Sequence, residues 1–318
     1  MRRALEQWGD IATELDYTAV GFGDHHWIAI DAGGKRHFVT LADLEHKEHC
    51  AHGSSGRGGV RTGLSRAMDT AAILGDVAEL DFVVAPARTR DGASVVPVGE
   101  RYAVSVFPFV AGSVGFFGET LPPQQRRRII ETLAALHGSS PPESTPQISP
   151  NVPGRHRLEQ ALDTLEQPWP GGPYAEPARE LLAEHAQVVR EKLAQLDRLI
   201  EAAGTPQAGV VVTHGEPHAG NVLQIEGRQL LVDWDTVGLA PPERDLWLVA
   251  AEPQDLDTYA QLTGRKPDPS AMALFSLRWA LADVVEFIDW FGRPHAETED
   301  TEQAWVGFSE TLEELSVE

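Results

Sequence analysis

The most constraining feature of this sequence is a polar loop set between two apolar, β-branched runs. The loop reads His214-Gly215-Glu216-Pro217-His218-Ala219-Gly220-Asn221, after Val210-Val211-Val212 and before Val222-Leu223-Gln224-Ile225. A third apolar run, Leu230-Leu231-Val232, ends at Asp233. Because Glu226-Gly227 separates the last two runs, we expect a β-hairpin there that brings Asn221 and Asp233 together.

The polar side chains at these strand ends suit phosphoryl transfer, which depends on positioning and charge neutralisation. Glu216 can orient an attacking hydroxyl and take its proton. Asn221 and Asp233 supply oxygen ligands of the kind that Mg²⁺ prefers beside nucleotide phosphates. The sequence therefore predicts Glu216 as the catalytic residue and Asn221 and Asp233 as metal ligands.

The same residues resemble the catalytic loop of the aminoglycoside phosphotransferase-like kinases, commonly His-Gly-Asp-x-x-x-x-Asn. The segments Val232-Asp233-Trp234-Asp235 and Pro241-Pro242-Glu243-Arg244-Asp245-Leu246 resemble the metal-binding strand and the following helix start of that family. The resemblance implies an α+β fold of the two-lobed protein-kinase-like type. A small β-rich N-lobe is expected at residues 1–108 and a mostly helical C-lobe at residues 109–318.

The resemblance also implies roles for residues around the central motif. Four of them are expected to support the catalytic loop: His214, His218, Asp235 and Asp245. For Asp235, a second contact to the metal is the alternative. ATP or GTP is the expected phosphoryl donor, with Mg²⁺ as the metal ion.

Nucleotide-binding residues are expected in the first lobe. Gly21 and Gly23 precede a strand predicted at residues 35–41, and backbone amides beside glycine can approach phosphate closely. An ordinary turn is the alternative for this glycine pair. The apolar run at residues 102–112 predicts a strand that ends at a break. The resemblance implies that the hinge between the lobes lies there, and an ordinary strand end is the alternative. The resemblance then implies that the backbone of Phe107, Phe109 and Val110 binds adenine.

Two positions depart from the family pattern. Glu216 stands where the family has aspartate, and a glutamate remains able to accept a proton because the two side chains have similar reference pKa values. Thr40 stands where the family has the lysine that binds the α- and β-phosphates. Lys47 and Arg66 are the candidate replacements for that cation. Asp69, on a helix predicted at residues 62–74, is the expected acidic partner.

Composition limits the possible partners. The chain has 26 basic and 48 acidic residues, a net charge of −22, which repels nucleic acid and attracts a cationic small molecule. Three acidic residues spaced by three on a helix predicted at residues 271–291 are candidates for acceptor binding: Asp283, Glu286 and Asp289. A solvated helix face is the alternative for them, and general solubility is the alternative for the charge.

Other regions give simpler expectations. Helices are predicted at residues 5–15, 122–138 and 176–203, and the glycine-rich residues 53–59 are predicted to form a connection. The chain has no apolar run of eighteen residues, so neither a membrane span nor a membrane partner is expected. A single cysteine, Cys50, excludes an intrachain disulfide, and the cytoplasm is the simplest location.

The sequence leaves two classes of function open. The first is a kinase that phosphorylates a hydroxyl of a small molecule, with an aminoglycoside or another antibiotic as the acceptor and antibiotic resistance as a possible role. Choline, homoserine or a sugar amine are alternative acceptors on the same scaffold. The second class is a nucleotide-binding regulatory module that has lost catalysis, which Thr40 and Glu216 would favour.

Overall fold

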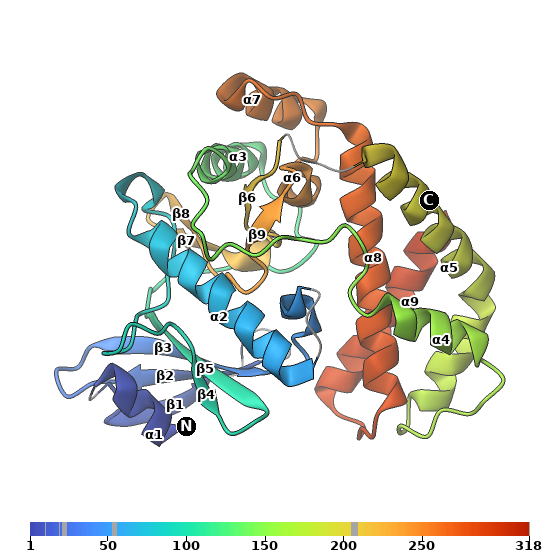
Figure 1. The fold of residues 1–318 in the computed structure, drawn as a ribbon, viewed down its shortest axis with the longest axis horizontal. Coiled ribbons are helices and arrows are strands. Elements are labelled where there is room, and N and C mark those ends of the chain that lie inside the picture. Colours follow the sequence, from blue (N-terminus) through green and yellow to red (C-terminus); the bar gives the residue numbers. More distant parts are fainter. Residues whose placement is uncertain (10, 19, 21–23, 53–55, 205–208, 318) are drawn as a thin grey trace. The chain divides into compact units, whose positions relative to one another are not determined.

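The computed structural model describes residues 1–9, 11–18, 20, 24–52, 56–204 and 209–317 (Figure 1). The chain divides into two compact units. Unit 1 comprises Met1–Ile148 and Gln207–Asp268, and unit 2 comprises Ser149–Pro206 and Pro269–Glu318. The predicted lobe boundary at residue 108 coincides with the last residue of a strand inside unit 1, and it stays a prediction.

Unit 1 begins with a five-stranded antiparallel sheet in the order β1-β2-β3-β5-β4. Its strands are β1 (Glu14–Thr18), β2 (His25–Ile30), β3 (Arg36–Asp43), β4 (Val96–Val98) and β5 (Tyr102–Pro108). Alternate side chains of β3 and β5 point into a core that includes Val39, Val104 and Val106. The short helix α1 (Arg2–Leu5) adds Leu5 to this core.

The start of the chain differs from its predicted helix at residues 5–15. Among the described residues of this segment, helical structure is limited to α1 and the 3₁₀ helix η1 (Glu6–Trp8), and residues 14–18 form β1 instead. Leu15 pairs with Ala29 of β2, and Tyr17 pairs with Trp27. The apolar spacing fits both a helix and a strand here, and pairing with a neighbouring strand decides the outcome because strand formation depends on tertiary context.

Helix α2 (Gly56–Gly75) packs closely against the short 3₁₀ helix η2 (Glu48–Ala51). A Cβ atom at Gly63 would overlap the backbone carbonyl oxygen of Cys50, so only glycine permits this approach. The helix starts earlier than predicted, because residues 56–59 of the expected glycine-rich connection are helical. Residues 53–55 of that connection lie outside the described residues.

The central motif forms two short antiparallel ladders in unit 1. Strand β6 (Val211–Thr213) pairs with β9 (Gly238–Ala240), and β7 (Val222–Ile225) pairs with β8 (Arg228–Leu231). The predicted hairpin with its turn at Glu226-Gly227 is therefore confirmed. Unit 1 also contains the helices α3 (Pro123–His137), α6 (Glu243–Val249) and α7 (Pro253–Thr263) and the 3₁₀ helices η3 (Ala78–Leu80) and η4 (Ala219–Asn221). Helix α3 confirms the helix predicted after Pro122.

Unit 2 is helical in the part of the chain that the structure describes. It comprises α4 (Arg155–Asp163), α5 (Ala175–Ala203), α8 (Pro269–Gly292) and α9 (Glu299–Val317), of which α5, α8 and α9 pack against one another. The helices predicted at residues 176–203 and 271–291 are confirmed as α5 and α8. None of the helices in the described ranges combines the length and apolar character that crossing a membrane requires.

Candidate active site

The polar loop between β6 and β7 is built around a glycine that no other residue can replace without strain. Gly215 has a φ of 102°, in the left-handed region, and a Cβ atom there would overlap the guanidinium of Arg244. Arg244 donates 2.7 Å to the hydroxyl of Thr213 and 2.8 Å to the carbonyl oxygen of Thr236. The loop therefore turns sharply around a buried arginine.

Asp245 braces the loop from helix α6. Its carboxylate accepts hydrogen bonds from the backbone N–H groups of His214, at 2.8 Å, and Gly215, at 2.7 Å. His137 at the end of α3 lies 3.0 Å away through Nε2, and its Nδ1 lies 2.8 Å from the hydroxyl of Tyr259. Burial by itself raises the pKa of Asp245, but the contacts with His137 outweigh burial and lower it. This arrangement fits the predicted supporting role of Asp245.

His214 joins the loop to the residue that precedes Asp233. Its Nε2 lies 2.9 Å from the carbonyl oxygen of Val232, and its Nδ1 lies 3.3 Å from the backbone N–H of Glu216. A neutral ring protonated at Nε2 satisfies both contacts, because it donates to Val232 and accepts from Glu216. Burial lowers the pKa of His214 to about 4. The ring therefore fixes the backbone of Glu216.

The depressed pKa of His214 predicts a loss of stability in acid. Its ordinary pKa of 6.5 applies to the unfolded chain, whereas the folded value is about 4. Between these values the unfolded chain binds a proton that the folded protein does not. The free energy of unfolding should therefore fall by ~1.4 kcal/mol per pH unit as the pH drops through this window. Urea unfolding from pH 7.5 to pH 4.5 measures the slope.

The His214→Gln variant separates this contribution from that of other titrating groups. Glutamine retains an N–H donor for Val232 but cannot bind a proton in this range. Its slope between pH 6.5 and pH 4.5 should be shallower than that of the parent by about one proton's worth, whatever its absolute stability. Equal slopes in the two proteins would contradict the assignment.

The hairpin places Asn221 beside the end of the strand that delivers Asp233. The backbone N–H of Val232 donates 3.1 Å to the carbonyl oxygen of Asn221. The side-chain Nδ2 of Asn221 donates 3.0 Å to the carbonyl oxygen of Glu216 and lies 3.3 Å from Nε2 of His218. The amide nitrogen is thus used within the loop, which leaves the amide oxygen as the group that can face a cation.

Asp233 carries the clearest sign of a site for positive charge. Its side chain keeps contact with solvent, yet the surrounding protein desolvates it, and the charges of Asp235 and Glu216 repel it. Both effects raise its pKa well above the ordinary value, and the nearby charge of Lys47 offsets them only in part. A divalent cation relieves such repulsion, and carboxylate and amide oxygens are the ligands that Mg²⁺ takes. The donor set therefore fits the metal that the fold implies.

The negative charge of Asp235 is balanced by Lys47, a residue far from it in the sequence. The ammonium of Lys47 lies 2.6 Å from its Oδ2 atom and 3.1 Å from Oδ2 of Asp24. Burial by itself raises the pKa of Asp235, but Lys47 and His49 outweigh burial and hold it well below the ordinary value. Asp24 was not identified from the sequence, although it directly follows the predicted phosphate-binding glycines.

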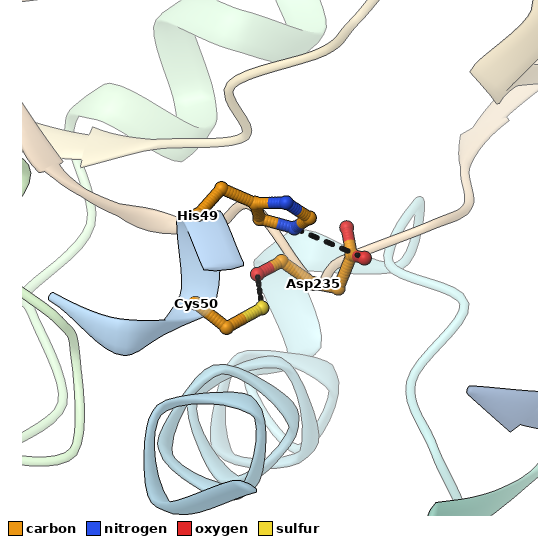
Figure 2. A group of neighbouring side chains, drawn as sticks. All are labelled: His49, Cys50 and Asp235. Atoms are coloured by element: carbon orange, nitrogen blue, oxygen red, sulfur yellow. Dashed lines mark hydrogen bonds and ion pairs between the residues drawn. The ribbon is translucent and has the colours of Figure 1, made fainter. Parts of the chain in front are cut away.

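Figure 2 shows a potential metal-ligand group formed by His49, Cys50 and Asp235, whose ligand atoms all lie within 4.8 Å of one another. Nε2 of His49 lies 3.4 Å from Oδ2 of Asp235, and the thiol of Cys50 lies 3.5 Å from the Asp235 carbonyl oxygen. The Oδ2 atom of Asp235 is the same atom that contacts Lys47. A protein cation therefore already balances the one carboxylate of this group.

The remaining predicted residues are those expected to bind the nucleotide. Gly21 and Gly23 fall outside the described residues. Phe107 pairs with Phe38 of β3, one residue before β5 ends, and the ring of Phe109 lies 4.0 Å from the guanidinium of Arg36. Val110 follows as a half-buried residue. Their binding of adenine stays a prediction.

The acidic residues predicted to bind the acceptor belong to helix α8 of unit 2. Asp289 forms an ion pair of 2.8 Å with Arg157, and Arg293 lies 3.7 Å from the same carboxylate. Glu286 is exposed and Asp283 is half-buried. These three positions therefore differ in their surroundings, and their role in acceptor binding stays a prediction.

The structure separates the two candidates for the missing cation. Arg66 lies on the exposed side of α2 and donates to the carbonyl oxygens of Ser144 and Thr145, whereas Lys47 is the cation beside Asp235. Asp69, the acidic residue expected to pair with this cation, has a different neighbour. Asp69 lies 3.9 Å from Arg88, and the carboxylates that contact Lys47 are Asp24 and Asp235.

The fold and the braced loop are those of a kinase-like phosphotransferase. A model of the phosphotransferase enzyme family matches residues 62–275. Protein StrN of Streptomyces griseus is 30% identical over 247 residues, which cover 73% of this chain and 72% of that protein. The chain therefore belongs to the phosphotransferase enzyme family.

Solved structures share the fold across nearly the whole chain. A spectinomycin phosphotransferase bound to ADP and spectinomycin has a TM-score of 0.72 at 16% identity, covering 99% of this chain and 96% of its own. A microcompartment-associated aminopropanol kinase has a TM-score of 0.60 at 14% identity, covering 99% and 95%. The ethanolamine kinase of Plasmodium vivax has a TM-score of 0.55 at 10% identity, covering 97% and 86%. The predicted α+β, kinase-like fold class is confirmed.

Proposed function

We propose that this protein transfers the γ-phosphoryl group of ATP or GTP to a hydroxyl of a small molecule, with an aminoglycoside or another antibiotic as the acceptor class. One observation carries the proposal. Glu216 and Asn221 share a loop that Asp245 braces, and the adjoining hairpin delivers Asp233 beside them. Phosphoryl transfer depends on this kind of positioning more than on covalent chemistry.

Glu216 is the residue proposed to orient the acceptor hydroxyl and to take its proton. Its backbone is fixed on both sides, because its N–H contacts His214 and its carbonyl oxygen accepts from Asn221. The side chain is half-buried, so it can meet a substrate while staying partly shielded from water. A fixed backbone beneath a carboxylate lowers the entropic cost of aligning it with the acceptor.

Asn221 and Asp233 are the residues proposed to hold Mg²⁺, and Asp235 supports them through its contact with Lys47. When bound, this ion neutralises phosphate oxygens during transfer. The repulsion around Asp233 and the inward use of the Asn221 amide nitrogen support the assignment. For the nucleotide, we retain the amides at Gly21 and Gly23 for the phosphates and the backbone of Phe107, Phe109 and Val110 for the base.

The acceptor is proposed to be cationic. The net charge of −22 favours encounter with a polyamine, and Asp283, Glu286 and Asp289 are retained as the residues that bind it. Aminopropanol and ethanolamine, for which two of the similar kinases are named, each combine an amine with a hydroxyl. Choline, homoserine and sugar amines are therefore the alternative acceptors.

A nucleotide-binding module without catalysis is the second candidate function. The observation that favours it is Thr40, which cannot supply the positive charge expected for the phosphates. Asn221 and Asp233 argue against it, because a module that only binds has little physical need for both metal ligands. We therefore place the kinase first.

The test is a screen of aminoglycosides, other antibiotics, choline, homoserine and sugar amines with ATP and with GTP in the presence of Mg²⁺. A nucleotide-dependent mass gain of one phosphoryl group on an acceptor would support the kinase and identify its substrate. Mg²⁺-dependent nucleotide binding without transfer to any acceptor would favour the module. Absence of nucleotide binding would overturn both.

A further inference from the structure

The strand position that would carry a phosphate-binding lysine holds no cation here. Thr40 lies on β3 opposite Ser105 of β5, and its hydroxyl lies 3.2 Å from Nδ1 of His26 on β2. Burial lowers the pKa of His26, so this neighbour is neutral near pH 7. A nucleotide bound against this sheet therefore needs a positive charge from another element.

Lys47 brings such a charge from the segment that follows β3. Its side chain is only 12% exposed, and its ammonium lies 3.1 Å from Asp24 and 2.6 Å from Asp235. Asp24 directly follows the glycines predicted to cover the phosphates, and Asp235 lies two residues beyond Asp233. The ammonium is therefore placed between the two segments that are expected to meet the nucleotide phosphates and the metal.

We propose that Lys47 binds the nucleotide phosphates in place of a strand lysine, and that Asp24 and Asp235 position its ammonium. This inference rests on the function proposed above. An ammonium has three N–H donors. That of Lys47 donates to Asp235 and forms an ion pair with Asp24. A remaining N–H donor is the one that a phosphate oxygen takes, and the two carboxylates keep the lysine charged.

The segment that carries Lys47 is closely packed. The 3₁₀ helix that follows Lys47 lies directly against α2 at Gly63, and the thiol of Cys50 contacts the carbonyl oxygen of Asp235. A long lysine side chain normally loses conformational entropy when it binds a ligand. Two ion pairs already order the side chain of Lys47 in the folded protein. Its conformational entropy is therefore lost on folding, and phosphate binding costs little further entropy.

The experiment compares ADP with adenosine, and GDP with guanosine, by calorimetry on the full chain with Mg²⁺. The variants are Lys47→Ala and Lys47→Gln, of which glutamine keeps a neutral donor for the two carboxylates and so protects the fold. Lys47→Ala should weaken binding of the diphosphate by about 10- to 100-fold, the effect of a lost charge-assisted hydrogen bond. Binding of the nucleoside should change by less than about 3-fold, because it has no phosphate.

The control is Arg66→Ala, which removes an exposed cation of α2 that bonds only backbone carbonyl oxygens among the contacts described for it. Its diphosphate affinity should equal that of the parent. Equal losses for diphosphate and nucleoside in both Lys47 variants would show a structural role and overturn the proposal. Unchanged diphosphate affinity would overturn it as well. If the parent binds neither diphosphate, the proposed function itself fails, and this inference fails with it.

Discussion

Replacing Asp233 by alanine is expected to abolish Mg²⁺-dependent nucleotide binding and to lower phosphoryl transfer by more than about 10³-fold. Neutralising the charge of the transferring group by a metal ion is worth several kcal/mol, and this carboxylate is its proposed charged ligand. Nucleotide affinity is measured in Mg²⁺ titrations, and turnover is measured with the acceptor found by the screen. Circular dichroism checks that the fold remains.

A second substitution separates charge from backbone strain. Asp233 has a φ of 64°, in the left-handed region, where alanine is less favourable than asparagine. Asp233→Asn keeps the shape and tolerates the backbone, so it should retain the stability of the parent while still losing most Mg²⁺-dependent binding. Asp81→Ala, an exposed aspartate paired with Arg228, is the matched control and should bind as the parent does. Unchanged affinity in both Asp233 variants would refute the metal assignment.

Replacing Glu216 by glutamine is expected to lower kcat by ~10²–10⁴, the usual worth of a positioned general base. Glutamine keeps the shape of the side chain but cannot accept the proton of the acceptor hydroxyl. Nucleotide affinity should barely change, because Glu216 is proposed to act on the acceptor and not on the phosphates. Steady-state kinetics with the identified acceptor, together with nucleotide titration, measures both quantities.

Glu216→Asp tests how the site has adapted to the longer side chain. If the acceptor sits to suit glutamate, the aspartate carboxylate falls short by about an ångström, and the variant should be slower than the parent. The exposed Glu226 in the hairpin turn supplies the control, since Glu226→Gln should leave kcat unchanged. A near-parental kcat in Glu216→Gln would remove Glu216 from the mechanism.

Local patterns predicted the parts of the fold that local interactions determine. The hairpin at residues 222–231 follows from two apolar runs around Glu226-Gly227, and α3 follows from a proline start and a glycine stop. The helix that the same kind of pattern predicted at residues 5–15 is wrong. Its apolar residues satisfy a helical period, but β2 offers a strand partner to residues 14–18, and no short-range signal reveals that partner.

Part of the candidate site could likewise be predicted from local sequence patterns, and part could not. Glu216, Asn221 and Asp233 lie within one motif, so their spacing along the chain is enough to predict that they lie close together. The contact of Lys47 with Asp235 joins residues 188 positions apart, and that with Asp24 crosses the whole of β2 and β3. Sequence reasoning could name Lys47 as a spare cation, but only the fold shows which carboxylates it meets.

The burial of the chain's one cysteine gives this protein an internal reporter of local opening. Cys50 is 0% exposed and lies three residues from Lys47, with its thiol against the backbone of Asp235. A thiol reagent can modify it only during the brief openings in which this segment leaves α2, so the modification rate measures the population of the open form. A ligand that binds only the closed segment lowers that population by mass action. Binding constants for unlabelled nucleotides are therefore readable from the kinetics of a single covalent reaction.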